Sequence, residues 1–556
     1  MIPRRLLAAA AAFMLLAPAV RYLDSPLRAD ESDFAAIVRE GILRHGIPAI
    51  PVEERRLIYA DPVTGLAEAH HGMWHPPLYQ YMLAAAAMVL PTANWSIRIV
   101  GLLCLAGSLI VAWRMVRMLA PDLAPSLRAI PVSLMLLSPI VVEGALFVDI
   151  DGGVLNLLIL LMLERWLAWR DRITPARTAL LAAIVALALS AKLTTPFLAI
   201  AAMGLHALCD RRRVRLGVTL GAAAIAGALM FGAAYLAYCA LTGYPADYMF
   251  RFYSLRAGVV EAKPASDYAI ALRWHLAWLG PPFVLMLAVY FAARAAAIVR
   301  ARAVERADLL WMFSALNLAF YAGAAAYWGK YSVPAASAGA LGAGLWLAER
   351  WPAIRVTRPR VLLVCLAGLG ALVLAMPVPR VRSGHMLLSA GTALWDPRNQ
   401  ALLALTVAPA ALALIAPRLI AAPWRATAPA FMLALCLAVS APIEQARIVF
   451  ARHDNAPLSA GVQIGFDALI ARLDTLEPGA MILAQKEVVY YYRGRGFGLE
   501  AETYGGSVAL LRAAHHPEVK AIVDSTLYPM LSPADIALLP PSRVETIGTY
   551  RVYVKD

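Results

Sequence analysis

The sequence predicts a polytopic α-helical membrane protein, and three observations support that prediction. The chain has 556 residues, of which 61% are hydrophobic and only 15% are charged. Soluble domains are about 45–50% apolar and about 25% charged, so a soluble fold lacks the polar surface to cover such a core. Apolar runs long enough to cross a bilayer recur along the whole chain, and arginine clusters separate them.

The net charge of +14 does not indicate a nucleic-acid-binding protein. The arginines lie in short clusters between apolar runs, as cytoplasmic loops of membrane proteins require. We therefore expect membrane lipids as partners and no nucleic acid. We also expect no disulfide framework, because the cysteines all lie in or beside apolar segments; they are Cys104, Cys209, Cys239, Cys365 and Cys436.

A membrane span needs about 20 apolar residues, and on this basis we predict about 13 spans. The N-terminus resembles a signal peptide, with Arg4 and Arg5 before a short apolar run. We interpret it as an uncleaved first span, because the chain goes on crossing the membrane. The predicted spans are 5–21, 96–118, 129–148, 152–169, 176–191, 194–209, 214–240, 276–293, 309–327, 333–348, 361–377, 401–416 and 426–442.

The arginine clusters also predict the orientation. If Arg4 and Arg5 face the cytoplasm, every second loop faces it too, and each of those loops is rich in arginine, as in "DRRRVR" at 210–215. The same alternation places two long loops, 22–95 and 241–275, and the tail after residue 442 on the outside. We expect a multi-pass protein of the cell inner membrane with an extracytoplasmic C-terminal domain.

We therefore divide the chain into a transmembrane domain, 1–442, and a small extracytoplasmic α/β domain, 443–556. Apolar, β-branched segments predict strands at 480–484 and 520–525, and helical periodicity predicts helices at 507–515 and 532–539. Ser532 is the expected cap of the second helix. Gly548 is the expected turn of a closing hairpin.

Three carboxylates crowd together directly after the first span, in the stretch "RADESDF". Apolar residues recur at helical spacing through 34–42, so the stretch predicts the start of an amphipathic helix at the membrane surface. One interpretation is structural: Asp30 is an N-cap, and Glu31 and Asp33 match the helix dipole. The other interpretation is catalytic, and it depends on the rest of the membrane region.

That region resembles the GT-C glycosyltransferases, in particular the protein O-mannosyltransferases and the aminoarabinose lipid A transferases. Members carry an Asp-Glu pair after the first span, then a "PPLYY"-like stretch, then an Arg that opens the second span. A second acidic site follows at the outer end of the fourth span. The matching residues here are Asp30-Glu31, Pro76-Pro77-Leu78-Tyr79, Arg98, and Asp149 with Asp151 in "FVDIDGG". "ALSAKLTTPF" around Lys192 and "KYSVPAASAGALGAG" at 330–344 are similar to two further family segments.

The resemblance implies a GT-C fold and an inverting glycosyltransferase, a hexosyl- or pentosyltransferase that uses a polyprenyl-phosphate sugar. The chemistry agrees, because no nucleotide sugars exist outside the cytoplasm. A carboxylate must take the proton of the acceptor hydroxyl, and we assign this role to Asp30, then to Glu31. Asp151, then Asp149, would position the acceptor or the base, since carboxylates at membrane depth are costly unless paired or functional. A solvated turn before "GG" is the alternative for both.

Cations must hold the lipid phosphate as it leaves. The predicted donor-phosphate ligands are Lys192, Lys330, Arg251 and Arg256. The loop that contains the two arginines is either a lid over the lipid or an ordinary interfacial helix, and Lys192 alternatively snorkels. The predicted substrate-binding residues are His75, Tyr79, Arg98 and Tyr331.

The sequence departs from the aminoarabinose transferases at two positions. Asp33 stands where many of them carry Arg, and His75 stands where they carry Lys. Both changes remove positive charge near the donor, so the resemblance does not fix the sugar or lipid A as the acceptor. The neighbouring His70 and His71, with His75 four residues further on, are a weak indication of a metal site. We expect no cofactor and no metal, with a divalent ion as the less favoured alternative.

The sequence thus predicts transfer of a sugar to an envelope acceptor, namely a lipid-linked glycan, a lipopolysaccharide or a protein. One alternative is an oligosaccharyltransferase with a diphosphate donor. Another is a lipid-glycan flippase or transporter, which predicts polar residues deep within spans and broken helices. A third is a non-catalytic scaffold on the same fold. The C-terminal domain would cover or select the acceptor; its aromatic residues Tyr490, Tyr491, Tyr492 and Phe497 either stack on sugar or pack in its core.

Overall fold

The computed structural model of the chain separates into two compact units. The helical unit contains Met1–Leu23, Gly101–Tyr235 and Lys263–Phe450; the mixed unit contains Asp24–Val100, Leu236–Ala262 and Ala451–Asp556. The structure describes residues 2–27, 30–51, 54, 57–58, 75–247, 249–250, 279–323, 329–376, 397–423, 426–449, 465–499, 511, 513–526 and 531–555.

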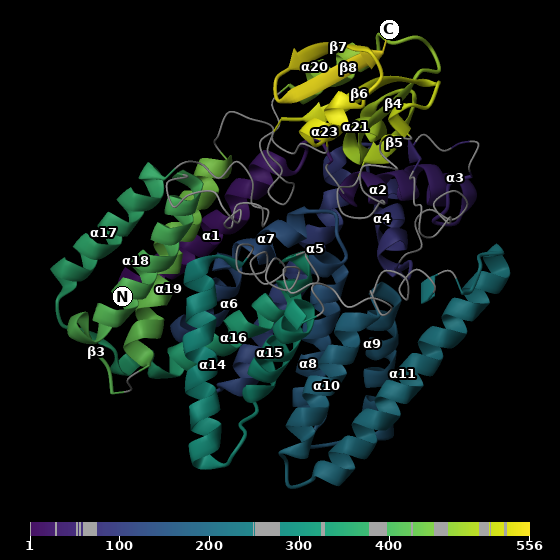
Figure 1. Ribbon diagram of the computed structural model, residues 1–556. Helices are drawn as coiled ribbons and strands as arrows, with labels where there is room; N and C mark the ends of the chain where they lie inside the picture. Colours follow the sequence, from purple (N-terminus) through teal and green to yellow (C-terminus); the bar gives the residue numbers. More distant parts are fainter. Residues whose placement is uncertain are drawn as a thin grey trace. The chain divides into compact units, whose positions relative to one another are not determined.

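A helix lies at each predicted span (Figure 1). The predicted span 129–148 is a pair of helices, α6 and α7, bent by 65°. The apolar helices are α1 (Ile2–Tyr22), α5 (Asn94–Leu119), α6 (Pro125–Leu137), α7 (Pro139–Leu146), α8 (Asn156–Trp169), α9 (Pro175–Ala191), α10 (Thr194–Leu208), α11 (Arg213–Thr242), α14 (Pro281–Ala301), α15 (Asp308–Gly323), α16 (Val333–Arg350), α17 (Pro359–Ala375), α18 (Pro397–Leu419) and α19 (Thr427–Val449).

Among the described residues, six helices are long and apolar enough to cross a membrane, and the bent pair would make a seventh. The exposed side chains of these helices are apolar as well. On α11, Val214, Val218 and Ile225 are each more than 60% exposed, which is typical of a lipid-facing surface and costly in water. The predicted multi-pass helical membrane protein is therefore confirmed, and the count of about 13 spans stays a prediction.

Helix α16 forms the centre of the helical unit and packs against α6, α14 and α15 (Figure 1). Small residues make this packing close. A Cβ atom on Gly344 would lie 2.3 Å from the Cα atom of Pro131 in α6, and a Cβ on Gly342 would lie 2.5 Å from the hydroxyl of Tyr290 in α14. Small residues at such contacts let helix backbones approach, which is how helices associate in lipid.

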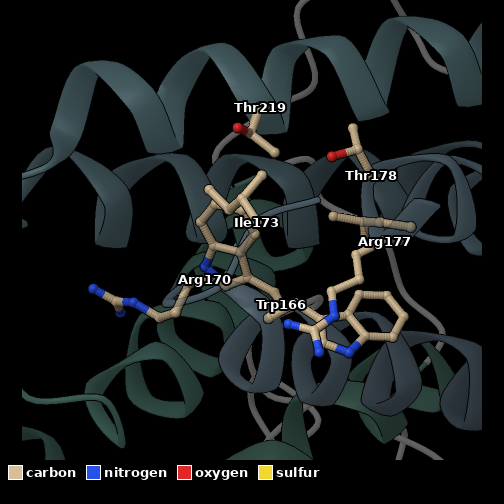
Figure 2. Close-up of a pocket in the computed structure, with 8 residues that line it drawn as sticks. Trp166, Arg170, Ile173, Arg177, Thr178 and Thr219 are labelled. Atoms are coloured by element: carbon tan, nitrogen blue, oxygen red, sulfur yellow. The ribbon is translucent and has the colours of Figure 1, made fainter. Parts of the chain in front are cut away.

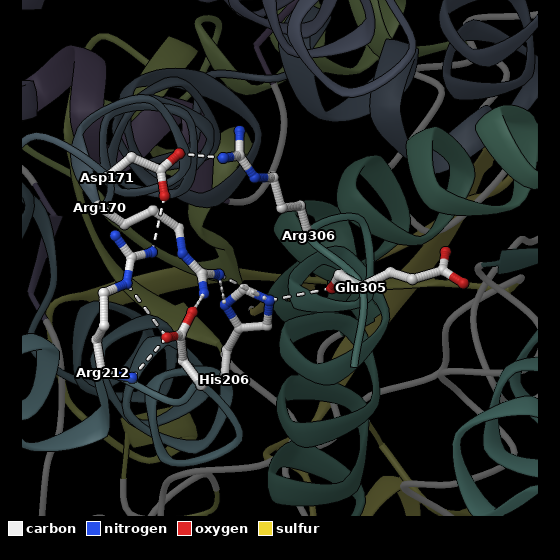
Figure 3. A network of polar contacts seen from close by, with 7 residues as sticks. Arg170, Asp171, His206, Arg212, Glu305 and Arg306 are labelled. Carbon is white, nitrogen blue, oxygen red and sulfur yellow. Dashed lines mark hydrogen bonds and ion pairs between the residues drawn. The ribbon is translucent and has the colours of Figure 1, made fainter. Parts of the chain in front are cut away.

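Ion pairs tie together three connections at one end of the helical unit: α8–α9, α10–α11 and α14–α15 (Figure 3). Asp171 pairs with Arg212 and Arg306, and Arg170 pairs with Asp210. Hydrogen bonding from the Arg212 backbone holds the pKa of Asp210 at about 2, so this carboxylate is ionised at neutral pH. The arginines of this network belong to the loops that the sequence predicts to be cytoplasmic.

A small pocket lies beside this network, between α8, α9 and α11 (Figure 2). Trp166 and Trp169 line it together with Arg177 and Thr178. Tryptophan and arginine side chains together are typical of the border between membrane and water. The pocket therefore agrees with the predicted end of the fourth span at residue 169.

The mixed unit contains a six-stranded sheet of order β1-β5-β4-β6-β8-β7. β1 (Leu57–Ile58), β5 (Arg495–Leu499), β4 (Met481–Gln485) and β6 (Val519–Ser525) are parallel, whereas β8 (Tyr550–Lys555) is antiparallel to β6 and to β7 (Ser542–Ile547). The helices are α2 (Asp30–Ala36), the π-helix η1 (Ile37–Ile42), α3 (Leu43–His45), α4 (Leu78–Val89), α20 (Phe466–Leu473), α21 (Lys486–Tyr491) and α23 (Pro533–Ala537).

The sheet confirms most of the predicted C-terminal elements. Both predicted strands exist, the hairpin turns at Gly548 with φ of 58°, and Ser532 caps α23 in a reciprocal capping box with Asp535. The predicted helix 507–515 lies largely outside the described residues. β5 and β1 were not predicted from the sequence. β1 lies in the first long loop and pairs with β5 in the sheet.

We predict that Gly344→Ala destabilises the protein and that Gly221→Ala does not. The added methyl at 344 overlaps Pro131, and such overpacking costs about 1–3 kcal/mol. Gly221 in α11 has open space around its Cβ position, so the alanine there is neutral or stabilising. Thermal unfolding of both variants in the same detergent measures the difference, and equal melting temperatures would contradict the packing described here.

Candidate functional site

The acidic stretch forms the first turn of α2 in the mixed unit, and Asp30 is the first helical residue rather than a residue before the helix. Asp30 keeps 27% of its side chain exposed, whereas Glu31 and Asp33 are buried. Three carboxylates at a helix N-terminus match its dipole. Burial at such a density requires cationic partners, because an unpaired buried charge is costly.

Lys486 at the start of α21 supplies one such partner. Its ammonium donates to Asp30 Oδ1 at 2.6 Å and to Asp33 Oδ2 at 2.7 Å. Asp30 and Asp33 lie on one face of α2 because they are three positions apart. Lys486 was not predicted from the sequence, and it lies 456 positions from Asp30 in the chain. We call Asp30, Asp33 and Lys486 the acidic site.

Glu31 faces a different partner. Arg98 in α5 donates to both of its carboxylate oxygens, at 2.8 and 2.7 Å, and both side chains are buried. Arg98 also donates to the backbone oxygens of Ser25 and Pro26. This bidentate pair therefore ties the segment after α1 to α5, and it encloses Glu31 and Arg98 within the fold.

The tyrosines of α21 are anchored in the mixed unit. Arg39 donates to the Tyr490 hydroxyl at 2.7 Å, and the backbone N–H of Leu27 donates to the Tyr491 hydroxyl at 2.7 Å. Burial raises the pKa of Tyr491 to about 12. These contacts favour the packing interpretation for Tyr490 and Tyr491. Two other aromatic residues, Tyr492 and Phe497, pack against the hydrophobic clusters of the sheet.

The second acidic site lies in the helical unit, where the chain leaves α7 and enters α8 through the π-helix η3 (Asp151–Leu155). The α7 backbone approaches this turn so closely that a Cβ atom on Gly152 would lie 2.0 Å from the Gly144 carbonyl oxygen. Only glycine fits there. Asp149 Oδ1 accepts the backbone N–H of Asp151 at 3.0 Å, which holds the two aspartates together.

Two lysines reach these aspartates from other helices. Lys192, after α9, donates to both Asp151 oxygens at 2.8 Å, and Lys330, before α16, donates to Asp149 Oδ2 at 2.6 Å. The Lys192 ammonium also lies 3.8 Å from the centre of the Tyr331 ring. We call these five residues the lysine–aspartate cluster. Burial raises the pKa of the Tyr331 hydroxyl to about 12, so the hydroxyl stays protonated at neutral pH.

The cluster corrects two alternatives that the sequence had left open. Asp149 and Asp151 are buried, so they do not form a solvated turn. Lys192 is buried and paired, so it does not snorkel to the membrane surface. Lys330 is the more accessible lysine, with 14% of its side chain exposed. Desolvating four charged groups is expensive, and in a membrane protein such groups mark functional sites.

Of the remaining predicted residues, the structure describes His75 and Tyr79 but not the two arginines. His75 is half-buried before α4, and Tyr79 in α4 is buried with its ring edge-to-face against Phe34 at 5.6 Å. The predicted phosphate ligands Arg251 and Arg256, and with them the predicted lid, lie outside the described residues, as do His70 and His71. Within the described part of the chain, no three His, Cys, Asp or Glu side chains gather as a metal site.

The chain has the fold of a membrane enzyme whose structure is known. The apo structure of ArnT from Cupriavidus metallidurans matches with a TM-score of 0.54 and 15% identity over 99% of this chain and 96% of that chain. The structure of the same protein bound to undecaprenyl phosphate matches with a TM-score of 0.57 and 15% identity over 99% and 97%. ArnT is an aminoarabinose transferase with a GT-C fold, so the predicted fold is confirmed.

No protein-family model matches the chain. No curated protein matches it either.

We predict that Glu31→Gln destabilises the protein far more than Asp30→Asn. Removing one partner of a buried pair costs about 3–5 kcal/mol because Arg98 is left uncompensated. The double variant Glu31→Gln with Arg98→Met would regain part of that stability. Thermal unfolding in detergent and the yield of folded protein measure the effect; a native melting temperature for Glu31→Gln would refute the structural role of the pair.

Proposed function

We propose that this protein is an integral-membrane, inverting glycosyltransferase that moves a sugar from a polyprenyl phosphate to an envelope acceptor. The acceptor is a lipid-linked glycan, a lipopolysaccharide or a protein, and the reaction occurs on the outer side of the inner membrane. The observation that carries the proposal is the buried lysine–aspartate cluster in a chain with the ArnT fold. The undecaprenyl phosphate bound to ArnT supports a polyprenyl-phosphate donor.

Lys330 is the proposed ligand of the donor phosphate. Lys330 keeps 14% of its side chain exposed and donates to Asp149 Oδ2, whereas Lys192 is buried, donates to both oxygens of Asp151 and lies against the Tyr331 ring. An ammonium binds phosphate through short, charge-assisted hydrogen bonds. Lys192, Asp149 and Asp151 then hold the geometry and charge around Lys330.

Asp30 is the proposed general base, because it is the most exposed of the three carboxylates in α2. The acceptor hydroxyl oxygen attacks the anomeric carbon while its proton passes to Asp30. The bond from that carbon to the phosphate oxygen breaks, and polyprenyl phosphate leaves. A single displacement inverts the anomeric carbon. Glu31 is held by Arg98, which ranks it below Asp30 for this role.

No cofactor is part of the proposal. The leaving group is a phosphate monoester, and the positive charge of its proposed ligand, Lys330, would stabilise it. His75 and Tyr79, both in the mixed unit, stay proposed contacts of the substrate, and Arg251 and Arg256 stay proposed ligands of the phosphate.

A lipid-glycan transporter is the second candidate, since the 65° bend between α6 and α7 and the charges buried beside η3 agree with the broken helices of transporters. The two functions differ in one respect that can be measured. A transferase makes product in a detergent extract, where there is no bilayer to cross, whereas a transporter makes none.

We predict that Asp30→Asn severely slows sugar transfer. Cells that lack the protein would be complemented with the native form, with Asp30→Asn, or with the exposed-loop control Asp122→Asn. Mass spectrometry of envelope glycans is expected to show one sugar lost in the null cells and restored by the native and control forms. The rate with Asp30→Asn should fall by about 10²–10⁴. Full restoration by Asp30→Asn would remove the catalytic assignment.

We predict that Lys330→Met weakens binding of undecaprenyl phosphate about tenfold or more, since a hydrogen bond to a charged group contributes about 1.5–3 kcal/mol. Lys520→Met is the matched control, because Lys520 is an exposed lysine of β6. Native mass spectrometry of the purified full-length protein measures both affinities. An unchanged affinity for Lys330→Met would show that the donor phosphate binds elsewhere.

A further inference from the structure

We propose that Lys486 is a positioning residue for Asp30, so that a C-terminal residue completes the acidic site. The inference rests on the proposed function, in which Asp30 is the base. Lys486 fixes the orientation of the Asp30 carboxylate by donating a hydrogen bond to its Oδ1 atom. The observation behind the proposal is that Lys486 of α21 is buried and that its ammonium donates to both Asp30 and Asp33.

The position of Lys486 is rigid. β4 lies between β5 and β6 in the sheet, and its last residue, Gln485, directly precedes Lys486. Further along α21, Tyr490 accepts a hydrogen bond from Arg39, and Tyr491 bonds to Asn94. Lys486 directly follows a central strand, and hydrogen bonds hold the residues four and five positions after it. Its backbone therefore has little freedom to move.

The two carboxylates use Lys486 differently. Asp33 is buried, so its contact at 2.7 Å holds the ammonium within the fold. Asp30 is partly exposed, so its contact at 2.6 Å holds a carboxylate that solvent and substrate can reach. Asp33 therefore fixes the lysine, and the lysine fixes Asp30.

Electrostatics gives Lys486 a second effect. Asp30 and Asp33 are like charges one helical turn apart, and they repel each other unless a cation lies between them. A carboxylate that loses a cation at 2.6 Å takes up a proton at higher pH. Among the described residues, the charged groups of the acidic site and those beside them in α2 and α21 are Asp33, Lys486, Glu31 with its partner Arg98, and the buried Glu487, which follows Lys486.

Removing Lys486 alone would take a cation away from both Asp30 and Asp33, and the single variant risks failing to fold. The decisive variant is therefore Lys486→Gln with Asp33→Asn, which keeps the net charge of the site while removing the contact to Asp30. Lys486→Arg is the conservative variant, and Lys520→Gln is the control in the same sheet. Purified full-length proteins would be added to detergent extracts of membranes from cells that lack the protein, which supply donor and acceptor.

The rate of sugar transfer would be measured by mass spectrometry between pH 5 and pH 9. We expect the double variant to keep the native melting temperature, to lose about 10- to 100-fold in rate, and to show an acid limb shifted to higher pH. Lys486→Arg should recover a large part of the rate, and Lys520→Gln should match the native protein.

The outcomes separate the two proposals. If the native protein transfers no sugar, the proposed function fails. If the native protein transfers sugar and the folded double variant has the native rate and pH profile, only the role of Lys486 fails. A folded Lys486→Arg variant as slow as the double variant would also overturn the positioning role, because restoring the cation would then not restore the orientation of Asp30.

Discussion

The structure depends on one constraint: a charge inside apolar surroundings must have a partner. The acids come from two short segments, and their bases come from distant parts of the chain. Asp151 meets Lys192 across 41 positions, and Asp149 meets Lys330 across 181 positions. Each pair exists only in a fold that brings together the helices that carry its two residues. The same groups that make the site chemically capable therefore also specify which helices of the unit come together.

Glycine at the break between α7 and α8 makes the lysine–aspartate cluster possible. A continuous helix would turn Asp149 and Asp151 to different sides, because they are two positions apart. The π-helix η3 and the contact of Gly152 with the Gly144 backbone break that regularity. Both aspartates then face lysines, and the backbone N–H of Asp151 is satisfied by Asp149. Local irregularity is common at functional sites for this reason.

Local signals explain what the sequence could predict. Spans are visible because hydrophobicity is a property of each segment, and Asp149, Asp151, Lys192 and Lys330 were found because their order agreed with a known family. Lys486 could not be found, because nothing local in the sequence separates it from Lys520, an exposed lysine within β6 of the same unit. Two strands were missed for related reasons: β1 has only two residues, and β5 contains two glycines, which are unfavourable in strands.

The acidic site also shows that the charge of a motif cannot be counted from the motif alone. Asp33 stands where many similar transferases carry Arg, so the sequence suggested a site with less positive charge. In the structure Lys486 lies against both Asp33 and Asp30, and the carboxylate at position 33 is what holds that lysine in place. An acid in the motif thus recruits a cation from the C-terminal segment. The electrostatic character of Asp30 follows from the assembled site, so the departure at position 33 is weak evidence about the sugar.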